Sequence, residues 1–135
     1  MTELTKKKIL VVDDEPAVCK SIREALLRED YEIDTAPGGE EALRLAGNKT
    51  YDVFLVDLMM PDIGGLDLLK MIRAECPAAR VIMITGYPTV KNTLQAMQTG
   101  AFDFLPKPFL PSTLRSLVAK ALGGGEGETG SSASG

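Results

Sequence analysis

The sequence contains no histidine and only two cysteines, Cys19 and Cys76, which lie far apart and form no CxxC pair. These absences exclude imidazole catalysis by this chain and nearly every kind of zinc site, because zinc in proteins is held mainly by histidine and cysteine. We expect both thiols to be reduced and to lie in or near the core of a cytosolic protein.

Long hydrophobic runs and excess positive charge are also missing. No apolar run approaches the roughly 18 residues of a membrane span, and residues 2–8 are polar, so neither a membrane segment nor a signal peptide is expected. The 135 residues carry a net charge of −4, which argues against nucleic-acid binding through bulk charge. The length suits one domain with its own core.

The sequence does contain short apolar runs that alternate with amphipathic segments. Strands are expected over 9–12, 31–36, 53–57, 81–85 and 102–105, of which 31–36 alternates as a half-buried edge strand should. Helices are expected over 16–30, 40–46, 66–75, 88–99 and 114–122. Such alternation predicts an α/β fold made of βαβ units, with a parallel sheet covered by helices on both faces.

Two finer expectations concern the helices. We expect Gly47 and the residue after it to stop the second helix before the central strand. The fourth helix is expected to gather Val90, Leu94 and Met97 on its apolar face, which would leave a mostly polar and mobile outer surface.

The composition changes at the C-terminus. Residues 123–135 are rich in glycine and serine and cannot bury a core. We therefore expect one folded domain over 1–122, followed by a disordered tail that is a linker or an expression remnant.

Five polar side chains follow or end the predicted strands: Asp13, Asp14, Asp57, Thr85 and Lys107. A parallel sheet gathers the carboxyl ends of its strands at one edge, where open α/β sheets bind ligands. Three carboxylates placed together would repel one another and favour a cation, and oxygen ligands without nitrogen or sulfur suit Mg²⁺. With a lysine and a hydroxyl beside them, these residues predict phosphoryl transfer to an aspartate.

Four segments together resemble the receiver domain of bacterial two-component response regulators. They are 11–15 (VVDDE), 55–61 (LVDLMMP), 84–86 (ITG) and 104–109 (FLPKPF), and the resemblance covers roughly residues 7–122. It implies a flavodoxin-like, doubly wound sheet with strand order 2-1-3-4-5 and five helices.

The resemblance also implies roles for the acidic residues. Asp57 would accept a phosphoryl group from a phosphohistidine on a sensor histidine kinase or a phosphotransfer protein. Asp14 and Asp57 would bind Mg²⁺ directly, Asp13 would help through water, and the backbone carbonyl of Met59 would be a further ligand.

For the other residues, the resemblance implies that Lys107 pairs with Asp57 and that its peptide bond to Pro108 is cis. Thr85 and Phe104 match the switch pair of the family, although Phe104 lacks the hydroxyl of the tyrosine often found there. Gly64 stands where the family commonly has aspartate, and we expect it to loosen or reshape the loop after Asp57.

The resemblance extends to partners. The family usually signals through its fourth helix, fifth strand and fifth helix, often by forming a homodimer, and this chain is similar to receivers attached to transcriptional activators. Turnover catalysis is not expected, and neither is direct binding of nucleic acid or membrane by this domain.

Two other functions are weaker candidates. An interaction module that works without phosphorylation would not need the acceptor residues, all of which are present. A phosphatase of the haloacid-dehalogenase kind has a nucleophile and an acid two residues apart, which here only Asp13 and Glu15 provide, and no cap insertion would enclose a substrate.

Overall fold

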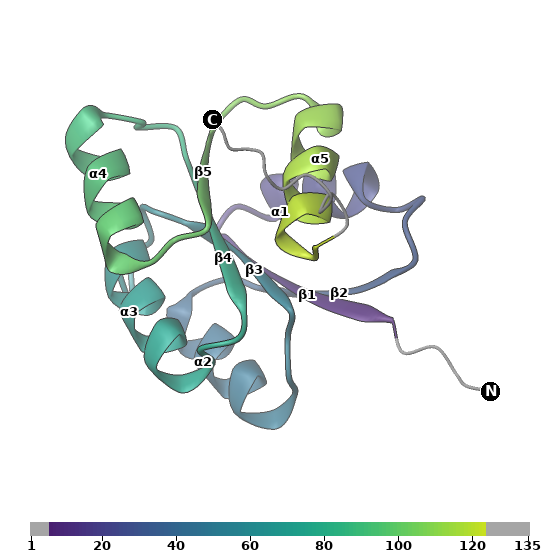
Figure 1. The fold of residues 1–135 in the computed structure, drawn as a ribbon, viewed down its shortest axis with the longest axis horizontal. Coiled ribbons are helices and arrows are strands. Elements are labelled where there is room, and N and C mark those ends of the chain that lie inside the picture. The colour runs from purple at the N-terminus through teal and green to yellow at the C-terminus, as the bar shows by residue number, and fades with distance from the viewer. Residues whose placement is uncertain (1–5, 124–135) are drawn as a thin grey trace.

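The structure, a computed structural model, describes residues 6–123 and shows ten alternating strands and helices (Figure 1). The strands are β1 (Lys7–Val12), β2 (Tyr31–Ala36), β3 (Val53–Asp57), β4 (Arg80–Thr85) and β5 (Asp103–Pro106). The helices are α1 (Pro16–Ala25), α2 (Gly39–Asn48), α3 (Gly65–Glu75), α4 (Val90–Thr99) and α5 (Pro111–Ala121). Of the tail expected over 123–135, residues 124–135 lie outside the described part.

The five strands form one parallel sheet in the order β2-β1-β3-β4-β5, which confirms the predicted fold. β2 is at one edge, as predicted, although its side chains are nearly all half-buried and do not alternate. From β1 the chain adds β2 on one side of that strand and then β3 on its other side. The crevice of a doubly wound sheet therefore opens between the carboxyl ends of β1 and β3.

Helices cover both faces of the sheet, with α1 and α5 on one side and α2, α3 and α4 on the other (Figure 1). Successive strand residues point to opposite faces, so each apolar run supplies two cores. The core under α1 and α5 contains Ile9, Val11, Val53, Leu55, Ile82, Ile84, Ile22, Leu26, Leu114 and Val118. The core under the other three helices contains Leu10, Val12, Phe54, Val56, Val81, Met83, Ala42, Leu68, Leu69, Ile72 and Ala96.

The two cysteines are free and half-buried, one against each core, as predicted. Some helix ends differ from the expectation. α1 ends at Ala25, five residues early, and α4 begins at Val90, where the hydroxyl of Thr89 caps it by accepting a hydrogen bond from the Asn92 amide (3.0 Å). α2 runs through Gly47 and ends only at Asn48, because the amide of Lys49 still bonds to the carbonyl of Leu45.

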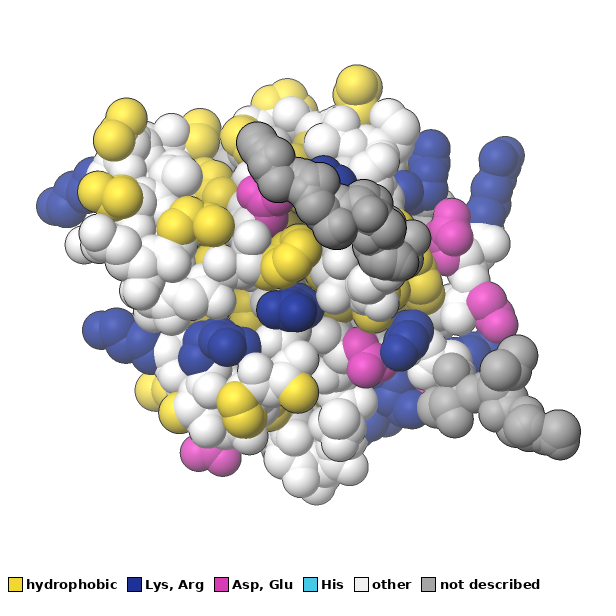
Figure 2. Space-filling view, in the orientation of Figure 1, with side chains coloured by type: hydrophobic (Ala, Val, Ile, Leu, Met, Phe, Trp, Pro, Cys, Tyr) yellow, Lys and Arg dark blue, Asp and Glu magenta, His cyan; other side chains and the backbone are white. Residues whose placement is uncertain are grey.

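The face of α4 that was expected to be inward is in fact outward. Val90, Leu94 and Met97 are 84%, 54% and 42% exposed, whereas Ala96 is fully buried. The three exposed residues recur at helical spacing and share one face, but α4 meets the rest of the fold through a different strip around the small Ala96. Figure 2 shows apolar side chains on the surface over α4.

Among residues 6–123, no helix has both the length and the apolar character that a bilayer crossing requires.

Candidate functional site

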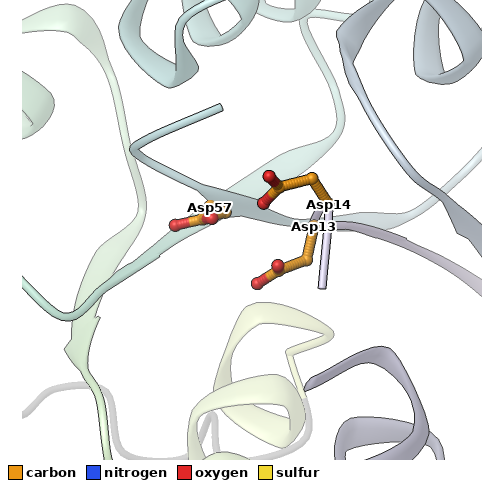
Figure 3. A group of neighbouring side chains, drawn as sticks. All are labelled: Asp13, Asp14 and Asp57. Carbon is orange, nitrogen blue, oxygen red and sulfur yellow. The ribbon is translucent and has the colours of Figure 1, made fainter. Parts of the chain in front are cut away.

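Three carboxylates meet at the carboxyl edge of the sheet (Figure 3). Asp13 and Asp14 directly follow β1 and Asp57 ends β3, and the register pairs Val12 with Val56. One oxygen from each of the three carboxylates lies within 4.8 Å of the others. Asp13 and Asp57 are buried, and Asp14 is exposed. The convergence predicted for these three residues is therefore present, and Asp14 leaves it open to solvent.

The surroundings of Asp57 disfavour its charge. Burial and the neighbouring Asp13 carboxylate raise the pKa of Asp57 from 3.8 to about 6, against the opposing effect of Lys107. The Met59 amide donates a long hydrogen bond of 3.4 Å to Asp57 Oδ1. An added cation would relieve the repulsion that this pKa reflects.

Lys107 supplies positive charge to the site from the loop after β5. Its Nζ lies 3.0 Å from Asp13 Oδ2, 3.4 Å from Glu15 Oε1 and 3.7 Å from Asp57 Oδ1. Burial lowers the pKa of Lys107, but the hydrogen bond to Asp13 and the nearby carboxylates outweigh it, so the pKa is raised. The ion pair expected with Asp57 is present at 3.7 Å, and the structure adds a nearer partner, Asp13, whose Oδ2 accepts a hydrogen bond from the ammonium.

The backbone brings Lys107 to this position. Its amide donates to the carbonyl of Thr85 (2.7 Å), and its peptide bond to Pro108 is cis, as predicted. The Thr85 side chain is fully buried at the end of β4, and its Oγ1 accepts a hydrogen bond from the Tyr87 amide (2.9 Å). Phe104 lies on the neighbouring strand, opposite Met83, half-buried against the core under α2, α3 and α4.

Hydrogen bonds hold the loop between β3 and α3 at its base and at Asp62, and the loosening or reshaping expected from Gly64 stays a prediction. The amide of Gly65 donates to the carbonyl of Leu58 (3.0 Å), and a Cβ at Gly65 would lie 2.5 Å from the backbone oxygen of Asp57. Within the loop, the Asp62 carboxylate accepts hydrogen bonds from the first amides of α2. Sequence reasoning missed Asp62, because nothing local shows that α2 lies within its reach.

The donor set at this edge fits a hard divalent cation. Among residues 6–123, the side-chain ligand atoms that converge here are carboxylate oxygens, and one ammonium, that of Lys107, faces Asp13, Asp57 and Glu15. Mg²⁺ favours such oxygen ligands and retains several waters, which the exposed Asp14 would allow.

Comparisons with known proteins identify a family of similar sequences. Residues 9–119 match the family model described as the response regulator receiver domain. The chain is 39% identical over 119 residues to the response regulator protein PilR of Pseudomonas aeruginosa, covering 88% of this chain and 27% of that protein. It is 40% identical over 111 residues to the transcriptional regulatory protein ResD of Bacillus subtilis, covering 82% and 46%.

Solved structures show the same fold. The receiver domain protein of Methanospirillum hungatei JF-1, described as CheY-like, superimposes with a TM-score of 0.84 at 31% identity, covering 87% of this chain and 94% of that one. The BeF3-activated DrrB receiver domain gives a TM-score of 0.81 at 30% identity, with coverages of 87% and 98%. The chain thus spans nearly all of these receiver structures but less than half of PilR or ResD.

Proposed function

Because this chain belongs to the response regulator receiver domain family, we propose that it is a phosphoacceptor switch of a two-component system, with Asp57 as the acceptor. The donor would be a phosphohistidine on a sensor histidine kinase or a phosphotransfer protein. The observation that carries the proposal is the meeting of three carboxylates within 4.8 Å at the edge of the sheet, with the Lys107 ammonium 3.7 Å from Asp57.

The proposed reaction is a displacement at phosphorus. A carboxylate oxygen of Asp57 forms the new O–P bond while the P–N bond to the donor imidazole breaks, and the electron pair of that bond stays on the imidazole nitrogen. Asp13, Asp14, Asp57 and the backbone carbonyl of Met59 would hold Mg²⁺, which supplies positive charge for the phosphoryl oxygens. Ionised Asp57 is the nucleophile, so a pKa of about 6 leaves it mostly reactive at neutral pH.

Lys107 and Thr85 would bind the transferred group. The ammonium, already 3.7 Å from Asp57 Oδ1, would pair with a phosphoryl oxygen. The Thr85 hydroxyl would donate to another, while its oxygen keeps accepting from the Tyr87 amide. A shift of Thr85 would then pull Tyr87 and the start of α4, and the half-buried Phe104 would follow by packing alone, because its ring has no hydroxyl.

The signal would leave through the face formed by α4, β5 and α5. The stripe of Val90, Leu94 and Met97 on α4 is exposed, which supports contact with a second copy of the chain when the switch is on. The output would be control of transcription in the cytoplasm through an output partner, since ResD is a transcriptional regulatory protein. This domain itself would bind neither DNA nor membrane, and its chemistry would be limited to self-phosphorylation and slow autodephosphorylation.

The test is covalent labelling by a small phosphodonor. Incubation with acetyl phosphate and Mg²⁺ should add one phosphoryl group, seen by intact mass, and a chelator should prevent it. Asp57→Asn should remain unlabelled, whereas the exposed Asp67→Asn serves as a matched control and should label normally. Equal labelling of Asp57→Asn would show that the acceptor is another residue.

A further inference from the structure

We propose that Asp62 is a positioning residue for the magnesium site. Its carboxylate bonds the loop that carries Met59 to the N-terminus of α2, and would so fix the position of Met59, whose carbonyl is the expected backbone ligand. The inference rests on the proposed function and adds a residue outside the expected phosphoryl-transfer set.

The tie consists of two hydrogen bonds from the first turn of α2. The Gly39 amide donates to Asp62 Oδ1 (3.1 Å) and the Glu40 amide donates to Asp62 Oδ2 (3.0 Å). The residue preceding α2, Gly38, has no side chain to cap the helix, so Asp62 satisfies these two amides from a distant part of the chain. Hydrogen bonds from the backbone, above all from the Glu40 amide, hold the pKa of Asp62 below its usual value.

The start of α2 is shaped to receive the loop. A Cβ at Gly38 would lie 2.7 Å from Asp62 Oδ2, and a Cβ at Gly39 would lie 2.7 Å from the Cβ of Ile63. Real Cβ atoms are not found at such distances, so the two glycines permit an approach that other residues would obstruct. The loop after β3 therefore packs directly on the backbone of α2.

The same loop is held to the sheet at its base. The Leu58 amide donates to the carbonyl of Ile84 (2.9 Å), and the Gly65 amide donates to the carbonyl of Leu58 (3.0 Å), so that residues 59–64 project from a fixed base. The residue before α3 is Gly64, which gives that helix no side-chain cap. Two side-chain contacts therefore hold the loop: a long hydrogen bond from the Met59 amide to Asp57 Oδ1 (3.4 Å), and the hydrogen bonds of Asp62 to α2. Met59 lies between the fixed base and Asp62.

Helix α2, to which Asp62 is hydrogen-bonded, is also connected to the site. α2 follows β2 through a short connection, and the carbonyl of Ala36 at the end of β2 accepts a hydrogen bond from the Asp13 amide (3.1 Å). Asp62 therefore joins the loop that carries Met59 to the segment that supports the backbone of Asp13. Loss of this link should let the two halves of the metal site move relative to each other.

The test measures Mg²⁺ affinity by calorimetric titration of the whole chain. The free energy of one helix cap corresponds to roughly a fivefold change in an equilibrium constant. If Mg²⁺ binding depends on this contact, Asp62→Ala should raise the Mg²⁺ dissociation constant about threefold to tenfold. Asp62→Asn keeps one acceptor oxygen and should give an intermediate value. At saturating Mg²⁺, labelling by acetyl phosphate should return nearly to the rate of the unaltered chain, because Asp62 does not touch the reacting atoms.

A matched control separates position from charge. Asp67→Ala removes the same charge from the first turn of α3, where the side chain is exposed, and should change the Mg²⁺ dissociation constant less than twofold. An equal effect of Asp67→Ala would overturn the proposal in favour of simple electrostatics. Gly38→Ala provides a second route to the same effect, since its Cβ would displace the Asp62 carboxylate and weaken Mg²⁺ binding.

Amide hydrogen exchange at Gly39 and Glu40 distinguishes the remaining outcomes. Faster exchange of these amides in Asp62→Ala together with unchanged Mg²⁺ affinity would make Asp62 only a cap of α2 and overturn the proposal. If the unaltered chain itself fails to bind Mg²⁺, the metal assignment of the proposed function fails first, and the role of Asp62 fails with it. Weaker Mg²⁺ binding in both Asp62→Ala and Gly38→Ala, with normal binding in Asp67→Ala, would support the positioning role.

Discussion

Replacement of Asp57 by asparagine should stabilise the metal-free fold at neutral pH, although it should abolish the proposed chemistry. Asp57 is buried, and burial together with the Asp13 carboxylate raises its pKa from 3.8 to about 6. The folded state binds the proton of Asp57 more tightly than the unfolded chain does. In the unaltered chain this contribution to stability is therefore fully present below about pH 4 and is lost as the pH rises through about 6. At pH 7 the fold therefore bears an unfavourable buried charge.

The size of the effect follows from the pKa. A shift of about two units corresponds to roughly 3 kcal/mol of lost stability at pH 7. Asparagine removes this term, which already includes the attraction of Lys107 at 3.7 Å, and its side-chain oxygen can still accept from the Met59 amide. We expect a net gain of about 1–3 kcal/mol, or roughly 4–10 °C in the melting temperature of a domain of this size.

Urea unfolding at pH 7 and at pH 4, both without divalent metal, measures this gain. The advantage of Asp57→Asn should be present at pH 7 and nearly absent at pH 4, where Asp57 of the unaltered chain is protonated. Added Mg²⁺ should stabilise the unaltered chain and reduce the difference. The exposed Asp67→Asn should stay within about 0.5 kcal/mol of the unaltered chain at both pH values.

Two results would refute this reasoning. One is a lower stability of Asp57→Asn at pH 7, which would mean that the attraction of Lys107 outweighs the burial of the charge. The other is a stability difference that does not change between pH 4 and pH 7, because the effect would then not come from the ionisation of Asp57.

Three further predictions follow from packing and charge. Gly65→Ala should lower the free energy of unfolding in urea by about 2–4 kcal/mol, because the added Cβ would lie 2.5 Å from the backbone oxygen of Asp57. Gly47→Ala, in open space within α2, should instead raise the free energy of unfolding by about 0.5–1 kcal/mol. Lys107→Met should lower stability by about 1–3 kcal/mol at pH 7 and raise the pKa of Asp57 further, which NMR titration would detect. Leu94→Lys should leave the melting temperature of the monomer nearly unchanged, since the side chain is 54% exposed; a loss comparable to that of Gly65→Ala would contradict the exposed face of α4.

The sheet and the acidic cluster could be predicted because both depend on simple regularities. The buried runs at 9–12, 53–56 and 81–84 supply side chains to two cores at once, so they are apolar throughout and readily recognised as strands. Once these strands are parallel, Asp13 and Asp57 must lie at the same edge, whatever the residues between them. The order of the strands came from resemblance and was not worked out from periodicity.

Other features depend on contacts that periodicity does not encode. The spacing of Val90, Leu94 and Met97 correctly predicts a shared helix face, but the buried face is set by the small Ala96, which is the buried residue of α4. The nearest partner of Lys107 depends on side-chain reach within a few ångströms. The link from Asp62 to α2 joins residues 22 and 23 positions apart, and only the folded structure brings them together.

The most direct test of the account is to locate the phosphoryl group after labelling with acetyl phosphate and Mg²⁺. Borohydride reduces an acyl phosphate to an alcohol, so a phosphorylated aspartate becomes homoserine and can be located by tandem mass spectrometry. The account predicts homoserine at position 57, and none when Mg²⁺ is chelated. Modification at another aspartate of the unaltered chain, or labelling that persists without metal, would contradict it.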